Sequence, residues 1–282
     1  MALRIFSQTP VSGKFDTGAN WVGGVAPTNG DSWIIDGVEG TPLEQNIDDG
    51  LDQSANTFVN GVLGKNYKGQ FGNSTTAPFK GGFSGVLAIE GGASEHYIDS
   101  SSKTIADARF NGCGVDGMGE LYLLGTITKC TVARGILHPW SGTWGELHQA
   151  AAPGSSAAQV FIRNADIASI YGFNGYGEVD IESTTGRIRN LTNASATWKI
   201  LAGQLDAASI AGGSVAYNSL TAISGAILVH GGEFALTNVQ AQTVARLAVF
   251  GAGRIRINQG LENDVITLLE NHGGGRLDGA LS

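Results

Sequence analysis

One short phrase recurs along the sequence and constrains the fold more than any other feature. It reads Gly-x-apolar-x-apolar, and clear copies begin at Gly119, Gly177, Gly232 and Gly253. Each copy has the form of a turn followed by a strand whose side chains alternate between two faces. Repetition of one supersecondary unit is typical of a solenoid, in which each unit contacts mainly its neighbours. We therefore expect a repetitive all-β scaffold.

The spacing of the phrase indicates the kind of solenoid. In the C-terminal half, one predicted strand family is centred on Ile181, Ile200, Val229, Val249 and Leu268. A second family begins at glycines and has an apolar residue two positions later: Ile188, Leu205, Phe234, Ile255 and Leu277. We attribute the long gap between Ile200 and Val229 to an extra copy that begins at Gly213. A period of about 20 residues with two or three short strands per turn predicts a single-stranded parallel β-helix.

Composition agrees with a parallel β-helix. The chain has 43 glycines among 282 residues, which suits many tight turns, and only 6 prolines. Few prolines are expected where each backbone N–H must find a partner in a ladder. A sandwich would show turns every ~8–12 residues without a long period. A propeller blade would need ~40 residues or more. Both alternatives fit the sequence less well.

The first 40 residues differ from the rest of the chain. They are rich in turn-forming residues and contain Trp21 and Trp33. An open terminal turn of a solenoid exposes apolar side chains and unpaired backbone, so it needs a cap. We predict an N-terminal arm and cap over residues 1–40, in which these tryptophans close one end of the hydrophobic stack. The solenoid should occupy residues 41–282, with a loop inserted near 138–156.

Residues 41–51 allow two predictions. Thr41, Pro42 and Glu44 have the form of a helix start, with an N-cap, a proline at the first helical position and an acidic third position. Apolar residues follow at helical spacing: Leu43, Ile47 and Leu51. Gly50 would end such a helix early. A short helix and a loop with short strands are equally compatible with this segment.

Charge and hydropathy exclude some classes of partner. The formal net charge is -8, and only 15% of residues are charged. An acidic chain is a poor direct partner for nucleic acid. No run of about 18 apolar residues predicts a transmembrane helix, so we expect no membrane partner. The N-terminal residues also lack the pattern of a secretory signal, which favours synthesis in a cytosol.

We expect neither a cofactor nor a metal. Cys113 and Cys130 have no zinc-site spacing, and two buried free thiols are preferred over a disulfide. The glycine-rich segment 112–119, with Asp116, partly resembles the calcium-binding nonapeptide of other β-solenoids. It occurs once instead of in tandem, so a tight turn is the preferred interpretation.

A row of carboxylates could suggest catalysis. Glu178, Asp180 and Glu182 alternate with Val179 and Ile181, so they should share an outer strand face. Glycan-cleaving enzymes use a pair of carboxylates as acid and base or nucleophile. Glutamates follow turn glycines in other copies as well: Glu120, Glu146 and Glu233. The carboxylates therefore look like a feature of the repeat, and we predict a solvated strand face and no catalytic residue.

Aromatic residues and histidines gather most densely between residues 138 and 148. Such a cluster could stack on sugars, bind a metal or anchor a partner protein, and tryptophan is enriched at interface hot spots. Two histidines with one glutamate are a weak metal signal. We expect a loop that packs on the side of the helix or at a subunit contact. The residues predicted to bind a partner are Phe6, Trp21, Trp33, His138, Trp140, Trp144 and His148. Aromatic residues that could extend this surface are Tyr171, Phe173 and Tyr176.

Two segments carry a resemblance. Residues 21–31, followed by a strand, resemble the opening turn of β-helical passenger and adhesin proteins. Residues 50–57 resemble a phrase of bacteriophage virion proteins built in the same way. Autotransporter adhesins carry a signal peptide, so the missing signal pattern favours the phage resemblance. The resemblance implies a β-helical virion protein, made in the host cytoplasm, of the capsid-decoration (cement) or tail type. Its implied partners are capsid or tail proteins of the same particle, and its implied state is a homotrimer.

Three functions are therefore compatible with the sequence. The first is a non-enzymatic virion structural protein that binds and stabilises a capsid or tail lattice. The second is a tailspike-like β-helix that binds or cleaves glycans, which would require exposed carboxylate pairs beside aromatic rings. The third is a bacterial surface adhesin, which would require a signal peptide in a longer precursor.

Overall fold

The fold is a parallel β-solenoid of about nine turns, as the sequence predicts. The computed structural model describes residues 1–151, 158–180, 182–238, 242–257 and 265–279. Its helical elements are two short 3-10 helices, η1 (Gly18–Asn20) and η2 (Val115–Gly117). The described part of the chain contains no helix with the length and hydropathy needed to cross a membrane.

The chain divides into two compact units, Met1–Trp144 and Gly145–Ser282. Strands that begin in the first unit are β1 (Leu3–Ile5), β2 (Ser32–Ile35), β3 (Asp52–Phe58), β4 (Gly61–Leu63), β5 (Phe79–Ile89), β6 (Glu95–Asn111) and β7 (Glu120–Ala150). Strands of the second unit are β8 (Ala158–Ile162), β9 (Asn164–Asn174), β10 (Tyr176–Val179), β11 (Arg187–Asn193), β12 (Thr197–Ile200), β13 (Gln204–Ile210), β14 (Ser214–Tyr217), β15 (Ile223–Val229), β16 (Glu233–Leu236), β17 (Thr243–Phe250), β18 (Arg254–Ile257), β19 (Val265–His272) and β20 (Arg276–Asp278).

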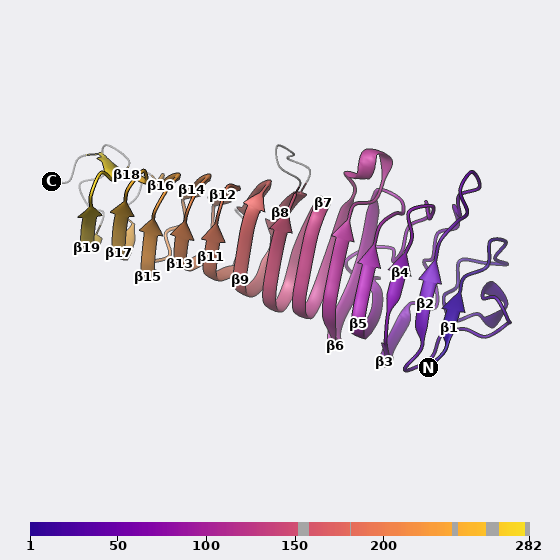
Figure 1. The fold of residues 1–282 in the computed structure, drawn as a ribbon. Coiled ribbons are helices and arrows are strands. Elements are labelled where there is room, and N and C mark those ends of the chain that lie inside the picture. Colours follow the sequence, from indigo (N-terminus) through magenta and orange to yellow (C-terminus); the bar gives the residue numbers. More distant parts are fainter. Residues whose placement is uncertain (152–157, 181, 239–241, 258–264, 280–282) are drawn as a thin grey trace. The chain divides into compact units, whose positions relative to one another are not determined.

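In the first unit, each turn hydrogen-bonds in parallel to the next through the strand order β1, β2, β4, β5, β6 and β7 (Figure 1). The interior of the N-terminal turns is aromatic. Phe15 lies 5.0 Å from Phe79 and 5.7 Å from Trp33 between ring centroids, and Phe71 lies 4.8 Å from Phe79. Each such ring buries roughly 150–250 Å² of surface, so this packing is a major stabilising term.

A compact segment packs against the first strand, β1. Phe6 pairs with Trp21 in an antiparallel bridge, and Trp21 Nε1 donates to the carbonyl of Phe15 at 2.7 Å. Asn20 is fully buried, and its amide group bonds the backbone of three residues: Val11, Ser12 and Lys14. Trp21 and Trp33 both contact Phe15, so both tryptophans belong to the aromatic interior of the N-terminal turns. The segment also supplies β1 and β2, which are themselves solenoid strands.

Residues 41–51 form no helix, so the alternative of a loop with short strands is the correct one. Leu43 bridges to Tyr67 and Ile47 to Phe71, both in parallel. The apolar spacing that suggested a helix instead points successive side chains into the solenoid interior, where Leu43 is 4% and Ile47 0% exposed. Burial in the stack therefore outweighs the local helix signal.

In the second unit, each turn contributes one short and one longer strand, and equivalent strands of successive turns stack into two columns (Figure 1). The short strands align Trp198 with Val215, Phe234 and Ile255, and the intervals between these residues give the predicted period. Longer strands form the other column, from β9 through β11, β13, β15 and β17 to β19. Most inward residues of both columns are aliphatic or aromatic and form the core of this unit.

The predicted strand families are correct in part. The alignments of Ile188 with Leu205 and of Phe234 with Ile255 and Leu277 are confirmed.

The link from Ile200 to Val229 is wrong, because Ile200 pairs with Tyr217 whereas Val229 pairs with Ile210 and Val249. The prediction crossed from one column to the other here, since both begin near glycines and alternate in the same way. The second family crosses too, because Leu205 lies in the long column and Phe234 in the short one. Val215, assigned to an extra copy, is a regular member of the short column.

The end of the first predicted family differs too. Leu268 lies opposite Arg246 and is 47% exposed, whereas the neighbouring Leu269 lies opposite the buried Leu247. The predicted centre is therefore displaced by one residue, which in a strand moves the side chain to the other face. Ile181, the first member of that family, lies outside the described residues.

The turns stack as regularly as the strands. Gly213 and Gly232 both have φ of +69°, and a Cβ on Gly232 would lie 2.4 Å from the carbonyl oxygen of Gly213. Only glycine fits where a left-handed turn sits directly against the turn below. The buried amide of Asn193 closes another corner by donating to the carbonyls of Ala196 and Gly212. These local requirements explain the glycine content.

A candidate partner-binding surface

The residues predicted to bind a partner separate into two groups. Four are core residues with at most 2% exposure: Phe6, Trp21, Trp33 and Trp144. Buried side chains of this kind stabilise the fold and offer no surface to a partner. The other three, His138, Trp140 and His148, are half-buried on the surface.

The expected loop near 138–156 is wrong for residues 138–150, which are extended within β7. The turn-forming residues that suggested a loop instead bend the strand. Gly142 has φ of +95°, and a Cβ there would lie 2.1 Å from the carbonyl oxygen of Gly125 in the preceding turn. Residues 152–157 lie outside the described residues. His138 and Trp140 therefore stand on a sheet face.

Three rings stack on that face in the first unit. The Tyr97 and Tyr122 centroids are 4.8 Å apart at 15°, and those of Tyr122 and His138 are 4.3 Å apart at 5°. Trp140 meets Tyr122 edge-on at 5.5 Å. The register explains the stack, because Tyr97 lies opposite Tyr122. We call these four residues the aromatic ladder.

Two carboxylates accompany the aromatic ladder. Glu95 and Glu120 lie opposite each other in the register of β6 and β7. The Tyr97 hydroxyl donates to Glu95, and the Tyr122 hydroxyl donates to Glu120 Oε2 at 2.7 Å. His138 Nε2 donates to the same Oε2 at 2.8 Å. Glu120 therefore joins two rings of the ladder.

The phenols of the ladder stay protonated. Burial raises the pKa of Tyr97 and of Tyr122, and the hydrogen bond and negative charge of the neighbouring glutamate raise it further. Neither hydroxyl can therefore act as a base near neutral pH. Both act as fixed donors that orient the carboxylates.

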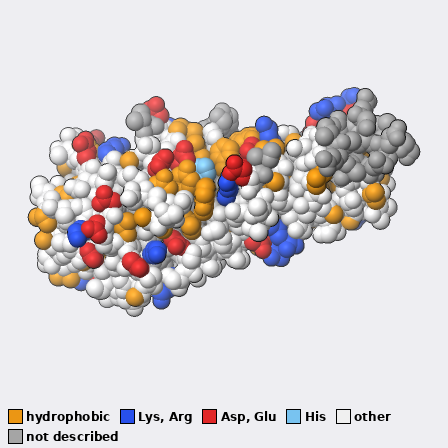
Figure 2. All heavy atoms as spheres, turned by 180° about the vertical axis from the view of Figure 1, so that it is seen from behind, with side chains coloured by type: hydrophobic (Ala, Val, Ile, Leu, Met, Phe, Trp, Pro, Cys, Tyr) orange, Lys and Arg blue, Asp and Glu red, His pale blue; other side chains and the backbone are white. Residues whose placement is uncertain are grey.

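Glu95 and Glu120 are not paired with lysine or arginine within the described residues, and the ion-pair partner of Glu120 is His138. Several other carboxylates do pair with arginines; these pairs include Arg4–Asp31, Arg109–Asp107, Arg187–Asp206, Arg189–Asp166 and Arg246–Glu270. Figure 2 shows one face on which hydrophobic side chains gather around a histidine with acidic side chains beside them.

The carboxylates singled out in the sequence are held in a different way. Tyr176 donates to Glu178, and Arg163 bridges Asp180, at 2.6 Å, and Glu182. Asp180 and Glu182 are thus neutralised by one arginine, which does not suit a free acid and base. The predicted common strand face is wrong, because β10 ends at Val179 and only Glu178 of the three lies on it.

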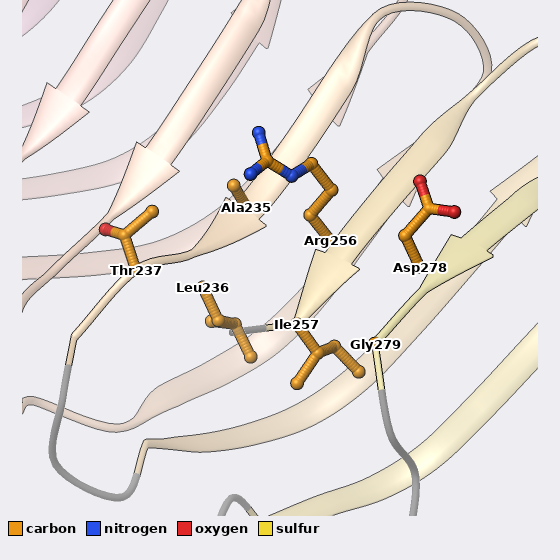
Figure 3. A pocket seen from close by; sticks show the side chains of 7 residues that line it. All are labelled: Ala235, Leu236, Thr237, Arg256, Ile257, Asp278 and Gly279. Carbon is orange, nitrogen blue, oxygen red and sulfur yellow. The ribbon is translucent and has the colours of Figure 1, made fainter. Parts of the chain in front are cut away.

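On two further surfaces of the second unit, the polar and charged side chains have partners close by. His148 bonds Glu146 at 2.9 Å and stacks on Tyr171 at 4.7 Å. A pocket of about 440 Å³ lies over the C-terminal strands, where Figure 3 shows Arg256 and Asp278 pointing away from Leu236 and Ile257. Arg256 donates to Glu233, and Asp278 accepts from Arg276 and Arg254. The charges of this pocket are therefore paired.

The cysteines and the glycine-rich turn have structural roles. Cys113 and Cys130 are buried free thiols, and burial raises the pKa of Cys113 to about 12. Residues 112–119 form a tight turn around η2, in which Asp116 adopts φ of +61° and its carbonyl accepts from Arg134. No group of three or more His, Cys, Asp or Glu side chains is placed to hold a metal in the described part of the chain.

The prediction from sequence included His138 and Trp140 but missed Tyr97, Tyr122 and Glu95. The signal was a Glu-x-Tyr triplet that occurs at 95–97 and again at 120–122. Only the register shows that these copies lie side by side. No protein-family model matches the chain, and the searches of curated proteins and solved structures find no similar protein.

Proposed function

We propose that this chain is a non-enzymatic structural protein of a virion, of the capsid-decoration or tail type, which binds neighbouring proteins through the aromatic ladder. The observation that carries the proposal is the ladder itself: rings prearranged on a sheet face beside carboxylates without lysine or arginine partners. Rigid aromatic side chains lose little conformational entropy when they bind, which suits an interface anchor.

The scaffold supports the same proposal. Parallel turns linked by a ladder of backbone hydrogen bonds make a repetitive body that can present one surface to a repetitive lattice. The resemblance of residues 21–31 and 50–57 to β-helical and virion proteins favours a particle as the setting. In this proposal the chain acts as a homotrimer, the state that the resemblance implies.

A test compares two aromatic surface positions. Purified protein is added to virions of the source culture that have been stripped of it, and rebinding is measured by co-sedimentation. We expect Trp140→Ala to weaken binding at least tenfold, because a central aromatic anchor is lost. Phe173→Ala, at a residue 50% exposed in the second unit, should bind like the wild type. If the wild type, Trp140→Ala and Phe173→Ala rebind equally well, the aromatic ladder is not part of the interface.

A second candidate is glycan binding or cleavage. It is favoured by Glu95 and Glu120, which lie on adjacent turns beside aromatic rings. Purified protein would be incubated with host polysaccharide and assayed for new reducing ends. Release that is lost in Glu120→Gln and kept in Glu178→Gln would replace the structural proposal with an enzymatic one.

A further inference from the structure

The aromatic ladder carries an unbalanced charge. Glu95 and Glu120 are directly opposite each other on adjacent turns, where strands lie about 4.8 Å apart. Like charges in this position repel and destabilise a sheet. His138 donates a hydrogen bond to Glu120, whereas Glu95 accepts from the neutral phenol of Tyr97.

The hydrogen bonds leave acceptor capacity on both carboxylates. The phenol and imidazole donors reach Oε2 of Glu95 and Oε2 of Glu120. The Glu120 side chain is 33% exposed, so a partner can reach it although water is partly excluded. A charge-assisted hydrogen bond gains strength in such an environment.

From this charge complementarity we propose that the aromatic ladder docks an arginine-bearing segment of a partner protein, whose guanidinium binds Glu95 and Glu120. This inference rests on the proposed function and names the chemistry of the partner. A planar guanidinium offers several donors in a fixed fork, so it can bond carboxylates on two adjacent turns and lie against aromatic rings. A lysine ammonium offers a single point charge.

A metal ion suits this site less well. The two glutamates and His138 are not among any group of three or more ligands that could hold a metal in the described residues. Each carboxylate already accepts a hydrogen bond from a tyrosine hydroxyl. An organic cation can still bind the remaining carboxylate oxygens by hydrogen bonds.

The experiment uses three labelled peptides that differ in one residue type. They are Ac-Gly-Arg-Gly-Arg-Gly-amide and its lysine and citrulline equivalents, titrated into the full chain by fluorescence anisotropy. Citrulline keeps the shape of arginine without the charge. We expect the arginine peptide to bind at least tenfold more tightly than the citrulline peptide and more tightly than the lysine peptide.

Variants locate the binding site. Glu95→Gln/Glu120→Gln should weaken arginine-peptide binding at least tenfold. Glu178→Gln, which also accepts from a tyrosine two residues away, should change it less than twofold. Thermal unfolding monitors the fold, and the single variants Glu95→Gln and Glu120→Gln replace the double variant if it does not fold.

Three results would overturn the inference: equal binding of the arginine and citrulline peptides, undiminished binding by the glutamine variants, or saturation of the same surface by an oligosaccharide or by a second copy of this chain. The failure of the proposed function is a separate result. If the double variant rebinds virions like the wild type, the guanidinium site is wrong and the lattice proposal stands. If the wild type binds arginine peptide but no virion, the lattice proposal fails.

Discussion

At the scale of single residues, several polar side chains inside the solenoid are hydrogen-bonded to the backbone of neighbouring turns. His96 is the clearest case, because it is fully buried and its ring nitrogens bridge two backbone groups. The Phe71 N–H donates to Nδ1 at 3.1 Å, so Nε2 carries the proton and donates to the carbonyl of Gly91 at 2.9 Å. These hydrogen bonds require the neutral ring with the proton on Nε2. A second proton on Nδ1 would face the Phe71 N–H and find no acceptor.

The stability of the protein should therefore depend on pH through His96. Burial lowers its pKa from 6.5 to about 4, so the unfolded chain takes up the proton first as the pH falls. The stabilisation is complete above pH 6.5, declines between pH 6.5 and 4, and amounts to about 3 kcal/mol in full.

Urea unfolding at pH 7 and pH 4.5 measures this effect. His96→Gln should lower stability at pH 7 and reduce the difference between the two pH values. His272→Gln, at an exposed histidine, should keep the wild-type difference. An unchanged pH dependence in His96→Gln would contradict the assignment.

At the scale of strands, the core depends on inward residues that meet across successive turns. Ile200 is fully buried in β12 and lies between Val179 and Tyr217 in the register. Thr197, on the same strand, is exposed. The two positions therefore separate the inward from the outward face of one short strand.

Replacing Ile200 with aspartate should abolish stable folding. An unpaired buried charge costs several kcal/mol, which is a large part of the stability of a typical domain. Thr197→Asp should remain folded, with a change within about 1 kcal/mol. Limited proteolysis and urea unfolding check both variants, and a protease-resistant Ile200→Asp protein would show that the inward face is misassigned.

The strands also show which structural features the local sequence pattern can predict. The recurring Gly-x-apolar-x-apolar phrase predicts strands and their inward faces, because alternation is a local property. It does not predict which column a strand joins, as Ile200 and Val229 show, since the two columns have the same local pattern. The absence of a helix at 41–51 has a similar cause: Leu43 and Ile47 are buried by partners distant in sequence.

At the scale of the whole molecule, the fold class was predictable and the candidate site was only partly so. Repetition and glycine content predict a solenoid, and the tryptophans near the N-terminus predict a cap. The aromatic ladder needs Tyr97 to meet Tyr122 and Tyr122 to meet His138, contacts that only the register of distant segments creates. His138 and Trp140 were found as candidates because they cluster locally, whereas Glu95 and Tyr97 were missed.

The central claim is that this solenoid is a lattice-binding protein of a virion that docks through the aromatic ladder. Electron cryomicroscopy of virions from the source culture tests it most directly. The account predicts solenoid density at regular positions on the capsid or tail, with Tyr122 and Trp140 in contact with a neighbouring protein and an arginine of that protein beside Glu95 and Glu120. Virions without such density, or with density whose aromatic ladder faces solvent, would contradict it.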